Sequence, residues 1–310
     1  MSRLVVAEAY GGPEVLAVQH IDLPQPTAEQ VLITVRAAGT NPVDYKLYSG
    51  FMGDDPAALP LPIGMEVSGV VAEAGPRAAG YTGPLTVGDE VIVTGVRGGY
   101  ADQVLADTAN VGHKPATLTH QEAAGLLLVG GTAWHLLTKT DVGSGDTVLI
   151  HGAGGGVGLL AVQLAVARGA TVIGTASAGR HEQLRRLGAQ PVEYGAGLAD
   201  RVRALGPVDV ALDLVGTDEA LDVSVELVAD RSRIATIAGF GRAGELGIAV
   251  LTGAGDGQAI RDAARPELIT LAAAGQLKVP VDKVFPLEQA ADAHRYLQGG
   301  HARGKVVLVP

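Results

Sequence analysis

The sequence predicts a mixed α/β protein in which a β-rich domain is split around an inserted, doubly wound parallel-sheet domain. Three observations carry this prediction: short β-branched runs in the first third, alternating strands and helices in the middle, and a strand-like tail. We therefore expect the β-rich domain to comprise residues 1–117 and 279–310, and the inserted domain to comprise residues 118–278.

The first third of the chain is expected to form short strands. Runs of β-branched and apolar residues occupy positions 31–35, 67–72, 91–94 and 100–105. Clusters of Gly and Pro separate these runs, which is typical of a small barrel or sandwich rather than of βαβ units.

The pattern changes near residue 118. Thr119 is followed three residues later by Glu122, a capping box that precedes an Ala- and Leu-rich helix. Strands are then expected at 147–151, 171–175, 208–212, 233–237 and 248–251, and helices at 159–168, 180–187 and 258–274. Strands that alternate with helices at this spacing form right-handed βαβ crossovers, so this sheet should be parallel.

The tail returns to the first pattern. Residues 279–286 and 305–309 are strand-like, and they flank an amphipathic helix at 288–297. We expect these strands to rejoin the first domain, with the α/β unit inserted between its two parts.

The composition excludes several classes of protein. Apolar residues make up 47% of the 310 positions and charged residues only 18%, which favours buried cores over disorder. The absence of cysteine excludes disulfide frameworks, thiolate zinc sites, iron–sulfur clusters and cysteine nucleophiles. A net charge of -10 without any Lys- or Arg-rich run argues against nucleic-acid binding. We find no secretion signal and no apolar segment of membrane-spanning length, so we expect a soluble cytoplasmic protein.

The segment 151–158, His-Gly-Ala-Gly-Gly-Gly-Val-Gly, follows an apolar strand and opens a helix. The register that fits a dinucleotide fingerprint places Ala153, Gly155 and Gly158 at its three small positions. Gly155 should let the backbone approach a diphosphate, and Gly158 should let the helix pack closely on the strand. The N–H groups expected to face the anion are those of Gly155, Gly156, Val157 and Gly158.

The second strand of the α/β unit indicates which nucleotide binds. An NAD-binding protein usually places Asp or Glu about 20 residues past the glycines, where this chain has Thr175. No carboxylate occurs before Glu182, whereas Ser177 and Arg180 offer a hydroxyl and a guanidinium that suit a 2′-phosphate. We therefore predict NADPH rather than NADH. The alternative is that Ser177 caps a helix and Arg180 is an exposed helix-start residue.

With these motifs the chain resembles the medium-chain dehydrogenase/reductase superfamily, in its zinc-independent quinone oxidoreductase branch. The resemblance covers essentially the whole chain and is carried by segments 37–44, 64–69, 87–91, 131–133 and 153–158. It implies a GroES-like catalytic domain split around an inserted Rossmann domain, with nicotinamide and substrate held between them.

The resemblance also permits a test for zinc. Zinc-dependent relatives place a cysteine where Asn41 stands and a histidine where Met65 stands. Glu66 and Asp44 remain, but two carboxylates without Cys or His do not make a catalytic zinc site, so we expect no metal. Without a metal to polarise a carbonyl, hydride transfer to an electron-poor acceptor is favoured over alcohol dehydrogenation.

The resemblance implies further cofactor contacts. Asn41 would hydrogen-bond near the nicotinamide ribose or the substrate, although it is equally a turn residue before Pro42. Thr132 would help seat the nicotinamide, unless it simply packs at the start of its helix. The positions that would complete the cofactor site are Thr175, Tyr194, Val215, Ala238, Gly239 and Phe240, of which Tyr194 could instead be a core residue.

The acceptor side is less defined. Many quinone oxidoreductases carry a tyrosine five residues after the asparagine, and here Lys46 stands in that place. Lys46 is therefore a candidate proton donor, with an exposed lysine as the alternative. The predicted acceptor pocket comprises Tyr48, Phe51, Met65 and Phe240.

The leading hypothesis is an NADPH-dependent reductase of quinones. The alternatives are a reductase of enone or alkenal double bonds, and a non-catalytic NADPH-binding protein. Because relatives commonly dimerise through an edge of the Rossmann sheet, we also expect a homodimer that pairs through residues 246–251.

Overall fold

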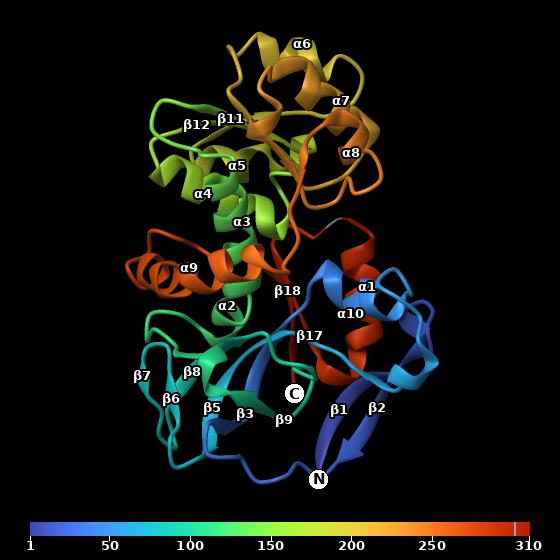
Figure 1. The fold of residues 1–310 in the computed structure, drawn as a ribbon, viewed down its shortest axis with the longest axis vertical. Helices are drawn as coiled ribbons and strands as arrows, with labels where there is room; N and C mark the ends of the chain where they lie inside the picture. The colour runs from blue at the N-terminus through green and yellow to red at the C-terminus, as the bar shows by residue number, and fades with distance from the viewer. Residues whose placement is uncertain (301) are drawn as a thin grey trace. The chain divides into compact units, whose positions relative to one another are not determined.

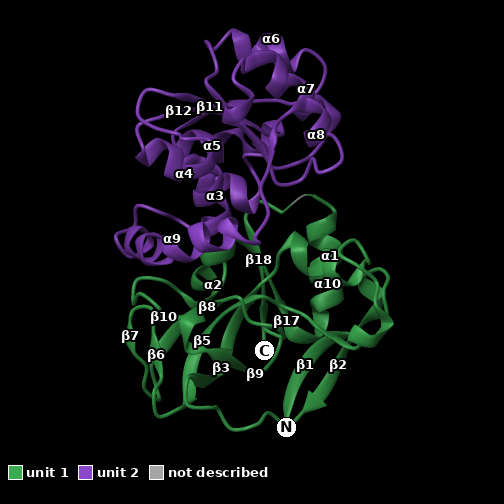
Figure 2. Cartoon of the chain, in the orientation of Figure 1, with its two compact units in different colours: residues 1–128, 279–310 green, residues 129–278 purple. Residues whose placement is uncertain are grey.

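The computed structural model describes residues 1–300 and 302–310, which form two compact units (Figure 2). Unit 1 comprises Met1–Leu128 and Val279–Pro310, and unit 2 comprises Val129–Lys278. The tail does rejoin the N-terminal part of the chain. The first boundary differs from the expected residue 117, because the segment around helix α2 (His120–Ala123) packs on the sheet of unit 1. At Gly39 an added Cβ would lie 2.1 Å from the carbonyl oxygen of Ala124.

The main sheet of unit 1 has seven strands, in the order β10-β8-β5-β3-β18-β17, with β9 paired to β3. These strands are β3 (Gln30–Gly39), β5 (Glu66–Ala74), β8 (Glu90–Thr94), β9 (Gln103–Asp107), β10 (Val111–His113), β17 (Val281–Pro286) and β18 (Lys305–Val309). Only β17 and β18 run parallel, and β18 pairs with β3 antiparallel. The tail therefore lies inside the sheet, as the strand pattern of residues 305–309 predicts.

Smaller elements complete unit 1. A three-stranded sheet has the order β2-β1-β4, and β6 pairs with β7 in a two-stranded ribbon. Their bounds are β1 (Ser2–Ala7), β2 (Leu16–Ile21), β4 (Leu61–Pro62), β6 (Ala79–Gly80) and β7 (Gly83–Pro84). The helices are α1 (Pro42–Tyr48), α2 and α10 (Ala290–Gln298). The strand expected at 100–105 begins only at Gln103, because Tyr100 instead joins β1 through its carbonyl oxygen, which accepts from the N–H of Val5 at 2.8 Å.

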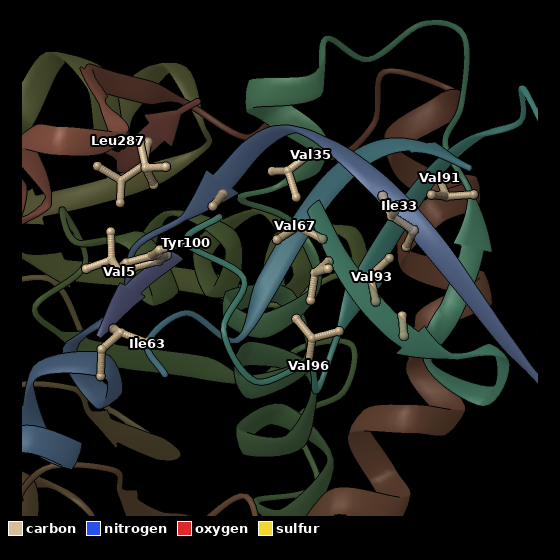
Figure 3. Packing of buried hydrophobic residues seen from close by; sticks show 14 of the residues in the cluster. Val5, Ile33, Val35, Ile63, Val67, Val91, Val93, Val96, Tyr100 and Leu287 are labelled. Carbon is tan, nitrogen blue, oxygen red and sulfur yellow. The ribbon is translucent and has the colours of Figure 1, made fainter. Parts of the chain in front are cut away.

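The core of unit 1 joins residues from both ends of the chain. Figure 3 shows Val5 of β1 near Tyr100, with Leu287 from the tail on the same side of the view. Ile33 of β3 and Val67 of β5 belong to the same core cluster. All five are almost completely buried. Burial of such side chains stabilises the unit by roughly 1.5–3 kcal/mol each, so the tail is a structural part of this core.

Unit 2 contains a six-stranded parallel sheet in the order β13-β12-β11-β14-β15-β16. The strands are β11 (Thr147–His151), β12 (Thr171–Thr175), β13 (Ala189–Val192), β14 (Val210–Asp213), β15 (Ile234–Thr236) and β16 (Ala249–Val250). Numbered within the unit this order is 3-2-1-4-5-6, the arrangement of a Rossmann domain. The order reverses between β11 and β14, and ligands of such sheets bind at the carboxyl ends of the strands there.

Helices connect these strands. They are α3 (Leu127–Lys139, which begins in unit 1), α4 (Gly156–Ala167), α5 (His181–Arg186), α6 (Leu198–Arg203), α7 (Asp218–Leu227), α8 (Ala243–Leu246) and α9 (Asp256–Ala273). Within residues 1–300 and 302–310, none of the helices has the length and apolar character that a bilayer crossing requires.

Candidate functional site

The glycine-rich turn joins β11 to α4, as the sequence predicts. Gly152 adopts φ of +74°, a left-handed conformation that favours glycine, and Gly155 is the residue that caps α4. At Gly158 an added Cβ would lie 2.4 Å from the carbonyl oxygen of Gly152. Only a residue without a side chain permits this close approach of α4 to the turn.

The amino end of α4 is suited to an anion. The first N–H groups of a helix have no acceptor inside it, which leaves those of Gly156, Val157 and Gly158 directed outward. Gly155 corrects the expectation, because its N–H donates to the carbonyl oxygen of Gly152 at 3.0 Å and thereby closes the turn. The turn therefore offers three N–H groups rather than four.

Arg180 lies beside this turn. Its Nη1 donates to the carbonyl oxygen of Gly154 at 2.8 Å, and an added Cβ at Gly154 would lie 2.4 Å from Cδ of Arg180. Ser177 caps the short helical turn that leads to Arg180, without a side-chain cap bond. Thr175 is buried and supports the turn, since its Oγ1 accepts from the N–H of Gly152 at 3.2 Å, and its contact with the cofactor stays a prediction.

Three predicted residues follow the carboxyl ends of neighbouring strands. Tyr194 follows β13, Val215 follows β14 and Phe240 follows β15, and all three are exposed. They therefore lie at the sheet edge where Rossmann domains bind ligands. Thr132, by contrast, is buried within α3.

A buried carboxylate that the sequence analysis missed organises this edge. Asp213 accepts hydrogen bonds from the N–H groups of Val215 and Gly216 and from the hydroxyl of Thr236, the last at 2.6 Å. Oγ1 of Thr236 in turn accepts from the N–H groups of Ala238 at 3.0 Å and Gly239 at 2.7 Å. These two N–H groups are therefore already bonded, and the contact of the backbone of residues 238–240 with a nicotinamide carboxamide stays a prediction. The sequence signal that could have revealed Asp213 is an acidic residue at the end of an apolar strand.

A buried polar cluster of unit 1 surrounds Asn41. Nζ of Lys305 donates to Oδ1 of Asn41 at 2.6 Å, to Oε1 of Glu66 at 2.7 Å and to the carbonyl oxygen of Thr40 at 3.0 Å. Nδ2 of Asn41 donates to the same Glu66 oxygen at 2.9 Å. Lys305 is 3% exposed and both Asn41 and Glu66 are 1% exposed. Asn41 is thus held in one orientation by a buried ion pair, and its hydrogen bond near the nicotinamide ribose or the substrate stays a prediction.

A second buried network extends from the first turn of α1. Asp44 accepts from the N–H of Asn41 at 2.8 Å and from the hydroxyl of Tyr100 at 2.9 Å, and burial raises the pKa of Asp44 to about 7. The Tyr100 oxygen also lies 3.1 Å from Nε2 of His294, whose Nδ1 lies 2.7 Å from the hydroxyl of Tyr48. Because Tyr100 gives its single proton to Asp44, His294 must donate through Nε2 and accept through Nδ1. Burial lowers the pKa of His294 to about 4, so the ring is neutral near pH 7.

One residue of the predicted acceptor pocket, Tyr48, does not fit an open pocket. Tyr48 is completely buried and stacks on His294 with ring centroids 5.7 Å apart, so it is a core residue and cannot line an open pocket. Phe51 is 62% exposed, and Nζ of Lys46 lies 5.3 Å from its ring centroid. Met65 is half-buried. A hollow of about 470 Å³ adjoins α1, and it is lined by Tyr10, Leu47, Met52, Gly53, Asp54, Asp55, Ala58 and Leu61, none of them a predicted pocket residue.

Comparison with known proteins places the chain in a family. Residues 27–142 match the alcohol dehydrogenase GroES-like domain, and residues 187–308 match the zinc-binding dehydrogenase domain. The quinone oxidoreductase of Pseudomonas aeruginosa is 33% identical over 100% of both chains. The solved quinone oxidoreductase of Escherichia coli, complexed with NADPH, is 27% identical over 100% of both chains, with a TM-score of 0.87.

The chain is a quinone oxidoreductase-like member of the medium-chain dehydrogenase/reductase superfamily. Within this superfamily it is an oxidoreductase with the split GroES-like and Rossmann architecture. A solved NAD-dependent alcohol dehydrogenase is 30% identical over 99% of both chains, with a TM-score of 0.87. The fold therefore does not by itself choose the cofactor or the acceptor.

The cluster around Asn41 does not fit the zinc that the family domain is named for. In this oxidoreductase the oxygens of Asn41 and Glu66 already accept hydrogen bonds from the ammonium of Lys305. A buried ammonium at these distances would repel a divalent cation. No group of three or more potential metal-ligating side chains occurs in residues 1–300 and 302–310. The sequence analysis did not find Lys305, because its partners lie more than 230 positions away along the chain.

Proposed function

We propose that this oxidoreductase transfers hydride from NADPH to a quinone or a similarly electron-poor acceptor, without a metal. The observation that carries the proposal is the position of Arg180 against the glycine turn, at the end of a β12 strand that lacks the acidic residue typical of NAD-binding proteins. Its quinone oxidoreductase relatives support the reaction class.

The residues present fit NADPH. The N–H groups of Gly156, Val157 and Gly158 would bind its diphosphate, while Arg180 and Ser177 would bind its 2′-phosphate. When bound, NADPH supplies the hydride and the protein supplies binding and orientation. Solved complexes of the Escherichia coli enzyme and of a mycobacterial relative with NADPH support this choice.

The chain's own residues favour an acceptor that needs little activation. Lys305 takes up the oxygens that could otherwise have held a metal, so no Lewis acid would polarise a carbonyl. A quinone accepts hydride readily, and a weak acid or solvent can supply the proton. Lys46, half-buried beside the exposed ring of Phe51, is the proposed proton donor.

The proposal is tested by steady-state turnover. NADPH and NADH are each paired with 1,4-benzoquinone and with a simple enone, and loss of absorbance of the reduced nicotinamide is followed. We expect the highest kcat/KM for NADPH with the quinone. Preference for the enone would replace the quinone assignment, and tight NADPH binding without oxidation by either acceptor would favour the non-catalytic alternative.

We also propose a homodimer that forms through β16. This strand is the last of the six-stranded sheet, so one of its edges is unpaired within the unit, and Val250 is 38% exposed. An unpaired edge readily pairs with a second copy of itself. Analytical ultracentrifugation should show a dimer at micromolar concentration that Val250→Lys weakens; a monomeric wild-type protein would refute the assignment.

A further inference from the structure

Two neighbouring side chains of unit 2, His135 and Arg261, have buried nitrogen atoms without hydrogen-bond partners among residues 1–300 and 302–310. His135 of α3 is 2% exposed, and neither of its ring nitrogens has a hydrogen-bond partner. Nε of Arg261 in α9 is also buried without a partner. Because unpaired buried polar groups destabilise a fold, two of them side by side indicate a site that a ligand completes.

Helix α3 packs against α9, and Figure 1 shows the two helices as neighbours. An added Cβ at Gly131 of α3 would lie 3.3 Å from Cβ of Arg261, and one at Gly257 of α9 would lie 2.7 Å from Cε1 of His135. His135 is one turn after Gly131, and Arg261 is one turn after Gly257. The helices therefore cross in opposite directions at two glycines, which places Arg261 close enough to His135 to affect its pKa.

An exposed loop lies against this crossing. Residues 252–255 are exposed and lead into α9, a helix of 18 residues. An added Cβ at Gly253 would lie 2.8 Å from Nη1 of Arg261, so the loop passes directly against the guanidinium. Arg261 is itself partly exposed. Part of the Arg261 side chain is therefore open to solvent, close to the positive end of the α9 dipole.

The charges around the crossing are mostly positive. Burial lowers the pKa of His135 to about 4, and Arg261 and Lys139 act in the same direction, so the imidazole is neutral at pH 7. The carboxylate of Asp262, the residue after Arg261, already forms an ion pair with Arg265 and accepts a hydrogen bond from Gln258 at 2.7 Å. Asp256 is exposed in the first turn of α9. Within the described chain, no carboxylate forms an ion pair with Arg261.

We propose that Arg261 and His135 bind a small carboxylate or phosphate group. The planar guanidinium presents two parallel N–H groups to two oxygens of such a group, and the neutral imidazole donates one further hydrogen bond. The group belongs either to a free anion or to an acceptor molecule that carries an anionic substituent. Only the second source rests on the proposed function.

Inorganic phosphate and acetate are the probes. Each is titrated into the full chain while the imidazole signals are followed by NMR, with the His135 signal assigned through His135→Gln. We expect a saturable shift that indicates a raised pKa of His135, because a neighbouring anion stabilises the imidazolium. Arg261→Gln should weaken binding roughly tenfold to hundredfold, and Arg261→Lys should weaken it less. Arg77→Gln, which removes an exposed cation in unit 1, is the control and should leave the titration unchanged.

The proposal is overturned if the His135 signal shows no saturable response, or if Arg261→Gln responds like the wild-type protein. Arg261 is partly exposed, so the Arg261→Gln variant keeps the test valid even if His135→Gln fails to fold.

The source of the bound anionic group is then decided by turnover of NADPH with benzoquinones that carry or lack a carboxylate. If the enzyme prefers the carboxylated quinone and Arg261→Gln abolishes this preference, the bound group belongs to the acceptor. If phosphate binds and no such preference exists, the bound group is a free anion. Both outcomes support the site. Failure of every quinone to oxidise NADPH would refute the proposed function while leaving the titration to decide the site.

Discussion

Replacing Lys305 by methionine should destabilise unit 1 strongly. The substitution keeps the length of the buried side chain but leaves the Glu66 carboxylate, 1% exposed, without its counter-charge. Breaking a buried ion pair on one side costs about 3–5 kcal/mol. Glu66 retains two neutral hydrogen-bond donors, Nδ2 of Asn41 at 2.9 Å and the N–H of Leu128 at 3.1 Å. We therefore expect the free energy of unfolding to fall by about 3 kcal/mol, the lower end of this range. This is a large fraction of the stability of an ordinary domain.

The measurement compares three variants by urea unfolding. Lys305→Met should unfold at a lower urea concentration, and the double variant Lys305→Met with Glu66→Gln should recover much of the loss, because no buried charge remains unpaired. Arg77→Met breaks an exposed pair with Glu29 and should cost less than about 1 kcal/mol. Hydrogen exchange of peptides from β5 and β18 should report the loss, while peptides from α4 in unit 2 should not.

Two results would refute this reasoning. If Lys305→Met were as stable as Arg77→Met, the ammonium would not be needed to neutralise Glu66. If the double variant were no more stable than the single one, the loss would come from packing of the lysine side chain and not from an unpaired charge.

The remaining predictions concern the glycine turn, the cofactor and Asp44. Gly158→Ala places a Cβ 2.4 Å from the Gly152 carbonyl oxygen and should abolish NADPH binding in a fluorescence titration, whereas Gly244→Ala, whose Cβ would meet nothing within 4 Å, should bind normally. Arg180→Ala should weaken NADPH binding roughly tenfold to hundredfold and leave NADH binding nearly unchanged; an equal loss for both would contradict the 2′-phosphate assignment. Burial raises the pKa of Asp44 from an ordinary 3.8 to about 7 in the folded chain. The free energy of unfolding should therefore fall by up to about 4 kcal/mol as pH rises from 3.8 to about 7, because the unfolded chain releases this proton first. Asp44→Asn should flatten this dependence in unfolding measured at pH 4 to 8, and an unchanged slope would assign it to other groups.

The sequence by itself determined the features that depend on local order. Hydrophobic runs and turn residues placed β3, β5, β8, β11 and β12 within a few residues of their observed bounds. The turn before α4 was identifiable because strand, glycines and helix are neighbours in the chain, and backbone conformation is decided over such short distances. The residues at 41 and 65 sufficed to predict that the zinc-ligand pattern is missing.

Only the tertiary structure decided how the polar side chains are used. Asn41 meets Lys305 across 264 positions, and Tyr48 meets His294 across 246, so no local pattern could reveal that both are committed to buried partners. His135 and Arg261 likewise converge only because two helices cross at glycines. The physical reason is that burial removes water as a hydrogen-bond partner, so each polar group must find another wherever the packing brings one. Which residue that is depends on the packing of distant segments, and spacing along the chain does not record it.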